Sequence, residues 1–341
     1  MHKPERLIAG WLLCGCVLIF LMVIVGGITR LTGSGLSITE WNVVKGTLPP
    51  LNEAEWKLAF AKYKESPQFR SENITFNLLQ FKHIFWWEFF HRLLGRVIGV
   101  VFIFPFLYFY FTRRLDSDVL RKLLVLLGLG ALQGFLGWFM VKSGLINLPH
   151  VSHYRLAVHL ITAFLIFGYS FRMALNLIYP LPAVLCRLNK RVRNLSTVLL
   201  LLAILQIIYG ALVAGLHAGK IYNSFPKMGS RWVPSEINVL QPCWKNFTEN
   251  LVTVQFIHRT LAWLIGILIC IIWVIGVKKR GAFLKQTQSH HVLLALFFLQ
   301  FLLGIATLLT SVSIPLAVLH QCCAFFLFAG ILFHLHSSKV A

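Results

Sequence analysis

The sequence predicts an all-α integral membrane protein whose eight transmembrane helices form two tandem four-helix bundles in a parallel pseudo-twofold repeat. Three observations predict this fold. Of the 341 residues, 57% are hydrophobic and only 13% are charged, a composition that excludes a soluble domain. Apolar runs close to the ~20 residues that a bilayer requires recur along the whole chain. A motif in the second run returns in the sixth, which indicates an internal repeat.

The apolar runs define the expected transmembrane spans and their orientation. Lys and Arg gather in the loops after the second, fourth and sixth spans, and the positive-inside rule places these loops and both termini in the cytoplasm. The formal net charge of +21 therefore indicates membrane topology and not nucleic-acid binding. The long loops 29–87 and 217–253 then face outward. The expected spans are 8–28, 88–111, 120–141, 154–178, 195–216, 254–277, 291–310 and 314–336.

The repeat is read most directly from one motif and its copy. Residues Glu88–Gly99 read E-F-F-H-R-L-L-G-R-V-I-G, and residues Gln255–Gly266 read Q-F-I-H-R-T-L-A-W-L-I-G. Their histidines, His91 and His258, are 167 residues apart. Each half holds an even number of spans, so both halves have the same orientation in the membrane. We therefore predict an N-terminal half at 1–180 and a C-terminal half at 190–341.

The repeat extends to the third and fourth span of each half. The pair Gln133 and Gly137 returns as Gln300 and Gly304, again 167 residues later. Four-helix units of this kind commonly hold cofactors between facing helices.

Four histidines occupy matched positions of the two halves. His91 in the second span is accompanied by His159 in the fourth, and His258 in the sixth by His320 in the eighth. Paired imidazoles from facing helices suit haem iron, whereas zinc usually takes a third or fourth ligand, and no such cluster is present. We therefore expect these four residues to be metal ligands, with buried structural histidines as the alternative.

Charged residues beside these histidines point to a site, because charges inside a span are costly. Arg92 and Arg259 directly follow two of the histidines, and Arg96 lies one turn deeper than Arg92. Arginine binds carboxylates bidentately, so all three are candidates for binding haem propionates. Snorkelling toward the membrane surface is the alternative interpretation.

The two copies of the motif differ at their first position. Glu88 in the first copy is replaced by Gln255 in the second, so only the first half has an ionisable group beside its histidines. An acid near a haem edge can accept protons or stabilise developing positive charge. The first half is therefore expected to be the chemical site, with Glu88 catalytic, and the second half an electron relay.

Several motifs together resemble the haem A synthase family, the membrane enzymes that convert haem O to haem A for terminal oxidases. The resemblance covers nearly the whole chain. Seven Cys are present, but the first outer loop has none, which resembles the family branch without a cysteine pair there. The motifs are G-G-I-T-R-L-T-G-S-G-L-S-I-T-E-W at 26–41, E-F-F-H-R-L-L-G-R at 88–96, Y-R-L-A-V-H-L at 154–160, Y-N-S-F-P-K-M at 222–228, W-V-P at 232–234 and V-Q-F-I-H-R at 254–259.

This resemblance implies one haem site in each half. His258 and His320 match the ligands of a haem b cofactor, and His91 and His159 match the site where haem O is oxidised. Glu88 matches the essential acid of the family. The implied reaction converts one ring methyl to a formyl group by successive hydroxylations, with water as the source of oxygen.

The same resemblance implies the cellular context. We expect a multi-pass protein of the bacterial cytoplasmic (inner) membrane, with haem O, haem A and the lipid bilayer as its binding partners. The haem O synthase and the assembly factors of terminal oxidases are its expected protein partners, and a homo-oligomer is compatible with the sequence. No nucleic-acid partner is expected.

Two other functions remain open from the sequence. A di-haem b-type electron-transfer cytochrome that exchanges electrons with a quinone explains the four histidines but leaves Glu88 without a role. A transporter is suggested by the duplication alone, and it predicts broken helices near the middle of the membrane and no bound iron.

Overall fold

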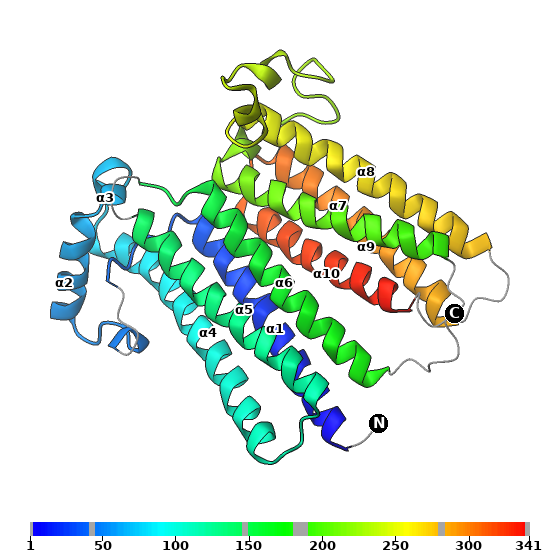
Figure 1. The fold of residues 1–341 in the computed structure, drawn as a ribbon. Helices are drawn as coiled ribbons and strands as arrows, with labels where there is room; N and C mark the ends of the chain where they lie inside the picture. The colour runs from blue at the N-terminus through cyan, green and yellow to red at the C-terminus, as the bar shows by residue number, and fades with distance from the viewer. Residues whose placement is uncertain (1–2, 41–44, 145–148, 180–189, 279–283, 338–341) are drawn as a thin grey trace. The chain divides into compact units, whose positions relative to one another are not determined.

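A computed structural model of the chain describes residues 3–40, 45–144, 149–179, 190–278 and 284–337. This part of the chain is helical and contains no β-strand (Figure 1), which confirms the predicted all-α class. Eight of the described helices are long and apolar enough to cross a membrane, so the eight expected spans are confirmed. They are α1 (Lys3–Leu31), α4 (Leu78–Phe111), α5 (Ser117–Gly144), α6 (His153–Ile178), α7 (Lys190–Gly215), α8 (Leu251–Lys278), α9 (Leu284–Leu309) and α10 (Ile314–Ser337).

Helix α4 departs most from the expected bounds, because it begins ten residues before the predicted start at residue 88. Asn77 caps it with a complete capping box, in which the Asn77 side chain accepts from the Gln80 backbone and the Gln80 side chain accepts from the Asn77 backbone. This reciprocal pair satisfies two donors at the start of the helix. The early turns of α4 are stabilised outside the apolar span, because they carry aromatic residues that pack against the first outer loop.

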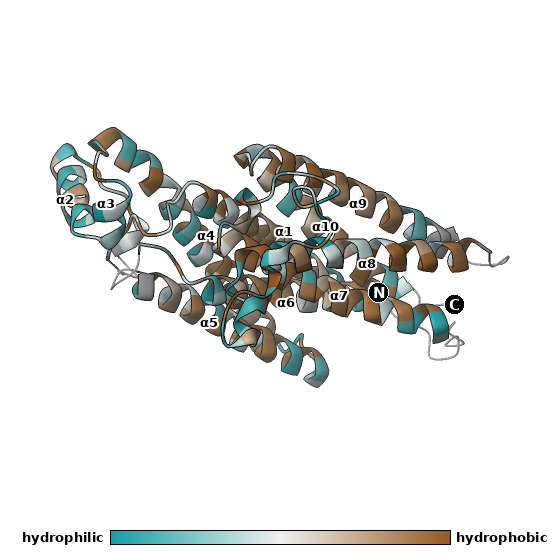
Figure 2. Ribbon diagram, turned by 90° about the horizontal axis from the view of Figure 1, so that it is seen from above, coloured by the Kyte–Doolittle hydropathy of each residue, from teal (hydrophilic) through white to brown (hydrophobic). Residues whose placement is uncertain are grey.

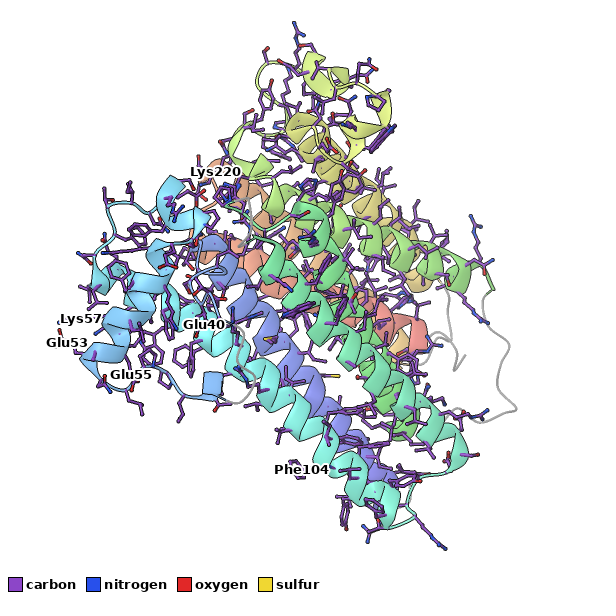
Figure 3. The ribbon with its side chains drawn as sticks, turned by 60° about the vertical axis from the view of Figure 1, so that its left-hand side comes forward. Glu40, Glu53, Glu55, Lys57, Phe104 and Lys220 are labelled. Atoms are coloured by element: carbon purple, nitrogen blue, oxygen red, sulfur yellow. The ribbon has the colours of Figure 1, made fainter. Side chains whose placement is uncertain are left out.

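That loop contains two short helices, α2 (Glu53–Lys64) and α3 (Pro67–Ser71), which the sequence did not predict individually. Their buried faces and the start of α4 form an outer aromatic cluster. The charged residues Glu53, Glu55 and Lys57 lie on the opposite, exposed face of α2 (Figure 3). The outer aromatic cluster consists of Trp56, Phe60, Tyr63, Phe69, Phe81, Ile84, Phe85 and Phe89.

Tyr63 connects this cluster to the loop that follows α1. Its side chain is fully buried, and its hydroxyl donates to Gln68 Oε1 (3.1 Å) and accepts from Asn73 Nδ2 (2.7 Å). Gln68 Nε2 in turn donates to the carbonyl of Gly33 (2.8 Å). Burial raises the pKa of Tyr63 to about 12, so the phenol is neutral at physiological pH and can act as a donor.

The described residues divide into two compact units. The N-terminal unit comprises residues 15–166, and the C-terminal unit comprises residues 1–14 and 167–341. In the C-terminal unit α7 packs on α8 and α9 packs on α10. Its core contains Val192, Leu199, Ala203, Ile265, Ile269, Ile272, Leu293, Phe297, Leu327, Ile331 and Leu335. The predicted halves 1–180 and 190–341, and their parallel repeat, remain predictions.

Hydropathy separates the spans from the loops that connect them (Figure 2). The long helices are predominantly hydrophobic, whereas α2 and α3 are largely hydrophilic. The basic loops that predict the topology fall partly at residues 180–189 and 279–283, which lie outside the described residues. The orientation of the chain across the membrane therefore stays a prediction.

The second long outer loop, residues 217–250, is fixed to the start of α8 by buried amides. Asn246 Nδ2 donates to the carbonyls of Leu240 (2.9 Å) and Cys243 (3.0 Å), and Asn246 Oδ1 accepts from the Leu240 amide (3.0 Å). Asn250 Nδ2 donates to the carbonyl of Glu236 (2.8 Å). These bonds satisfy the backbone of a loop that has little regular secondary structure.

We predict that Phe81→Ala destabilises the N-terminal unit by about 3–5 kcal/mol, because it removes a fully buried ring from the outer aromatic cluster. Thermal unfolding in detergent, followed by tryptophan fluorescence, measures the effect. Leu79→Ala is the matched control, since Leu79 lies on the same helix and is 72% exposed. Equal unfolding temperatures for the two variants would contradict a structural role for this cluster.

Candidate functional site

The structure brings the predicted histidines together as two pairs, one in each unit. His91 on α4 and His159 on α6 lie close enough to interact electrostatically, and so do His258 on α8 and His320 on α10. The side chains of all four histidines are partly buried. Each unit therefore presents two imidazoles from two different helices.

Each of the four rings packs against a glycine of a neighbouring helix. A Cβ atom on Gly137 would lie 3.2 Å from Cε1 of His159, and a Cβ atom on Gly304 would lie 2.9 Å from Cε1 of His320. Such close approach requires a residue without a side chain. The other two contacts are those of Gly26 with His91 and of Gly210 with His258.

Three of the rings also contact a glutamine amide. The Nε2 atoms of Gln133 on α5, Gln206 on α7 and Gln300 on α9 lie 3.4, 3.3 and 3.3 Å from the Nε2 atoms of His159, His258 and His320, respectively. Gln133 Nε2 also donates to the backbone carbonyl of His159 (3.1 Å).

The polar atoms around these imidazoles test whether a haem fits. The Nδ1 atoms of His159, His258 and His320 are buried and have no hydrogen-bond partner within the described part of the chain, and the same holds for Oε1 of each neighbouring glutamine. A buried polar atom without a partner costs about 1–3 kcal/mol, so such a cluster indicates a site for a ligand.

The side chains available as metal ligands indicate which kind of metal suits the two histidine pairs. Among the residues described, no group of three or more His, Cys, Asp or Glu side chains is arranged to hold a metal ion. A structural zinc site needs four such ligands. Haem iron needs only two axial ligands from the protein, and a pair of imidazoles supplies them. The residues of each unit therefore fit a haem with two histidine ligands.

Glu88 lies one turn before His91 on α4 and is almost completely buried, with 2% of its surface exposed. Its Oε1 accepts from Nε (3.1 Å) and Nη2 (2.6 Å) of Arg92, and the two residues form an ion pair whose side chains are 3% (Glu88) and 10% (Arg92) exposed. Its Oε2 accepts from Oγ of Ser37 (2.7 Å) and from the backbone amide of Ile38 (2.8 Å). All four acceptor positions of the carboxylate are thus occupied by donors.

Arg92 also binds the backbone of the first outer loop. Its Nη2 donates to the carbonyl of Ile38 (2.8 Å), and its Nη1 donates to the carbonyl of Glu40 (2.9 Å). The loop residues of the G-S-G-L-S-I-T-E motif are therefore held by both members of the ion pair. The expected propionate role of Arg92 competes with these bonds, which already engage its guanidinium.

The C-terminal unit has a related arrangement in which a neutral amide, Gln255, stands in place of the carboxylate. Gln255 Nε2 donates to the carbonyl of Tyr222 (3.1 Å), and Arg259 Nη2 donates to the carbonyls of Ser224 and Pro226 (both 2.9 Å). Nη1 of Arg259 and Oε1 of Gln255 are buried and have no hydrogen-bond partner among the residues described. Arg259, unlike Arg92, therefore keeps a donor for an anionic group.

Arg96 lies two turns deeper on α4 than Glu88 and reaches the short helix η1 (Lys45–Thr47). A Cβ atom on Gly46 would lie 2.9 Å from Nη2 of Arg96. No partner for Arg96 could be predicted from the sequence, and the structure brings its guanidinium close to Gly46 in the first outer loop.

Sequence reasoning missed the roles of Ser37, the glutamines and the glycines. The signal for part of this set was available, because the repeat already matched Gln133 and Gly137 with Gln300 and Gly304. The role of Ser37 carried no such signal, since its contact with Glu88 joins residues from a loop and a helix 51 positions apart.

Comparison with known proteins places the chain among cytochrome oxidase assembly proteins. The model of that family matches residues 9–332. A protein of Flavobacterium psychrophilum named haem A synthase is 48% identical, over 98% of each chain. Proteins of the same name from Nitrosospira multiformis and Wolbachia pipientis wMel are 45% and 43% identical, over 99% and 96% of this chain and 94% and 91% of theirs.

We predict that Gly304→Ala lowers the haem content of the purified protein. The new methyl group would lie 2.9 Å from Cε1 of His320, so the imidazole would have to move from the position in which it could ligate a haem. The absorption spectrum, normalised to protein, measures the loss. Gly134→Ala is the control, because a Cβ atom there has no neighbour within 4 Å; equal haem content in both variants would show that the glycine contact is dispensable.

Proposed function

This chain belongs to the cytochrome oxidase assembly protein family, whose relatives of matching length are named haem A synthase, and we propose that it oxidises a ring methyl of haem O to the formyl group of haem A. The observation that carries the proposal is an asymmetry between two similar pockets. Both units hold a pair of imidazoles, but among the residues that the structure describes only the N-terminal unit has a buried carboxylate, Glu88, beside its pair.

The chemistry explains why two different pockets are needed. Converting a methyl group to a formyl group with one water molecule releases four electrons and four protons, and the electrons must pass to an external acceptor. The protein must therefore bind the substrate in one place and pass electrons onward from another. We assign substrate binding to the N-terminal unit and electron transfer to the C-terminal unit.

In the C-terminal unit we assign His258 and His320 as the axial ligands of a haem b cofactor. Such a haem supplies one-electron redox chemistry when it is bound. Arg259 is our candidate for binding a propionate, because its Nη1 is buried and has no hydrogen-bond partner among the residues described. Its Nη2, bonded to loop carbonyls, fixes the orientation of the guanidinium.

In the N-terminal unit we assign His91 and His159 to the iron of haem O, and Glu88 to catalysis. The two oxygens of Glu88 accept four hydrogen bonds, two of them from Arg92. The carboxylate therefore has no free acceptor position for a proton from the substrate. Glu88 then acts by stabilising positive charge that develops on the substrate, and not by accepting a proton.

Arg92 is a positioning residue in this proposal. Its bonds to Glu88, Ile38 and Glu40 keep the carboxylate in place and attach the first outer loop to α4. Arg96 remains a candidate for a propionate of the substrate.

The eight apolar helices make the chain a multi-pass membrane protein. We place it in the bacterial cytoplasmic membrane with both termini in the cytoplasm, as the basic loops predict. The haem O synthase and oxidase assembly factors are its proposed partners, since substrate and product are both hydrophobic haems that would pass between membrane proteins.

The assignment of ligands predicts different outcomes for the two pairs. His258→Ala and His320→Ala should deplete haem b, because each removes an axial ligand of the cofactor. His91→Ala and His159→Ala should retain haem b but make no haem A. Pigment extraction from purified variants, followed by chromatography, measures both outcomes, and equal loss of haem b from all four variants would contradict the division between units.

Glu88→Gln should reduce haem A formation by roughly 100-fold or more, the usual effect of removing one electrostatic group from a catalytic site. Haem O or a hydroxylated intermediate should accumulate instead. The side-chain amide of the new glutamine also fits this site imperfectly. Its NH₂ group must face another hydrogen-bond donor, either Arg92 or the backbone amide of Ile38.

Ser37→Ala is the control for this structural effect. It removes one hydrogen bond from Glu88 but keeps the charge, so haem A formation should fall about tenfold at most. Near-normal haem A from Glu88→Gln would make the carboxylate structural and would favour a di-haem electron-transfer cytochrome.

A further inference from the structure

Arg155 is a charged residue of a transmembrane helix to which the proposed function gives no role. It lies in the first turn of α6, four residues before His159 and within the Y-R-L-A-V-H-L motif. Residues four apart on a helix are neighbours on one face, so Arg155 lies one turn from a candidate iron ligand. The helix dipole is positive at this end and disfavours a cation there. An arginine at this position therefore costs stability unless an anion lies nearby.

The guanidinium of Arg155 rests on an aromatic ring. Its Cζ lies 4.3 Å from the centroid of the Phe139 ring on α5. Such stacking uses the face of the guanidinium and leaves the N–H donors at its edge for other groups. Arg155 is partly buried, and within the described ranges no hydrogen bond or ion pair joins it to an acceptor. These donors are therefore available for a ligand.

Helices α5 and α6 hold Arg155 and His159 next to each other. Gly137 on α5 lies against the ring of His159, and Phe139, two residues further along α5, lies against the guanidinium of Arg155. The packing that fixes the imidazole thus also fixes the guanidinium one turn away from it.

The arginine on the facing helix, Arg92, is already engaged. Two of its nitrogens donate to Glu88, and it also donates to two carbonyls of the first outer loop. Its counterpart Arg259 has a neutral neighbour, Gln255, and keeps a buried Nη1 with no hydrogen-bond partner in the part of the chain that the structure describes. The carboxylate of Glu88 therefore occupies, in the N-terminal unit, donors of the kind that remain available in the C-terminal unit.

Arg155 and its aromatic neighbour are not repeated in the second half of the chain. At the repeat offset of 167 residues, Phe139 corresponds to Ala306. The residue four positions before His320 is Leu316. The second half thus has neither a cation nor an aromatic ring at these positions, and the extra arginine occurs in the half whose other arginine is engaged by a carboxylate.

We propose that Arg155 binds a propionate carboxylate of the substrate haem in the N-terminal unit. This inference rests on the proposed function, in which His91 and His159 ligate the iron of haem O. A guanidinium binds a carboxylate through two parallel hydrogen bonds, and Arg155 takes here the role that we assign to Arg259 in the C-terminal unit.

This contact has a consequence for the reaction. Two axial ligands alone leave a macrocycle free to rotate about the axis that joins them through the iron. A propionate bound to Arg155 would stop this rotation, so the same ring methyl would face Glu88 in every molecule. Arg155 is therefore a positioning residue, and it complements the charge of Glu88 without contacting the methyl group that reacts.

Titration of the purified full-length protein, with its haem b in place, tests the proposal. The two probes are haem O and its dimethyl ester, in which both propionates are neutral. Arg155→Gln should weaken the binding of haem O by roughly tenfold to hundredfold, the effect of one hydrogen bond to a charged group. It should weaken the binding of the ester much less, because a neutral ester accepts weaker hydrogen bonds than a carboxylate. Absorbance changes during the titration measure both affinities.

Two further variants separate the specific contact from general effects of charge and folding. Lys142→Gln is the matched control, because Lys142 is also a cation stacked on a ring of α5, 4.8 Å from the centroid of Trp138, but is exposed; both affinities should stay unchanged. Arg155→Lys keeps the charge and loses the planar fork, so the loss for haem O should be smaller than with Arg155→Gln. If Arg155→Gln also loses haem b, Arg155→Lys provides the same comparison of the two probes.

The comparison of the two probes decides the outcome. Equal weakening of haem O and of the ester would make Arg155 structural and would overturn the proposal, as would unchanged binding of haem O or an equal effect of Lys142→Gln. If the unmodified protein binds no haem O in addition to its haem b, the proposed function itself fails, and this inference fails with it.

Discussion

The buried ion pair between Glu88 and Arg92 is the interaction on which the N-terminal site depends. Two charges within an apolar helix are tolerated only when each is neutralised and fully hydrogen-bonded. Arg92 neutralises Glu88, and the remaining bonds come from Ser37 and from the backbone of Ile38 and Glu40. Removing either partner would leave a buried charge unpaired, at a cost of about 3–5 kcal/mol. The first outer loop is therefore required for the charge to exist in this position.

Much of the fold could be predicted from the sequence because membrane spans obey simple rules. Length and hydropathy alone give eight helices, and burial of backbone groups in lipid leaves few alternatives. The start of α4 was predicted ten residues too late, since Leu78–Trp87 is aromatic enough to extend a helix but is stabilised by α2 and α3 and not by lipid. Packing against elements far along the chain is not visible in hydropathy.

The candidate site was predictable where it repeats and was missed where it does not. The four histidines, and the contrast between Glu88 and Gln255, follow from aligning the chain with itself. The partner of Arg92 was not predictable in this way, because a propionate and the carboxylate of Glu88 are equally good partners for a guanidinium. Only the geometry shows that Glu88, four residues earlier on the same helix, engages it.

The two histidine sites have closely similar surroundings, and the difference between them is local. Each has two imidazoles, a glycine beneath each ring and an arginine that binds loop carbonyls. Position 88 is a carboxylate and its counterpart 255 is a neutral amide. The two side chains differ in charge but have similar volumes, so the packing of the helices is preserved. In our proposal, this one change gives the N-terminal site its chemistry without a new fold, because the fold is set by apolar contacts and the chemistry by a few polar atoms.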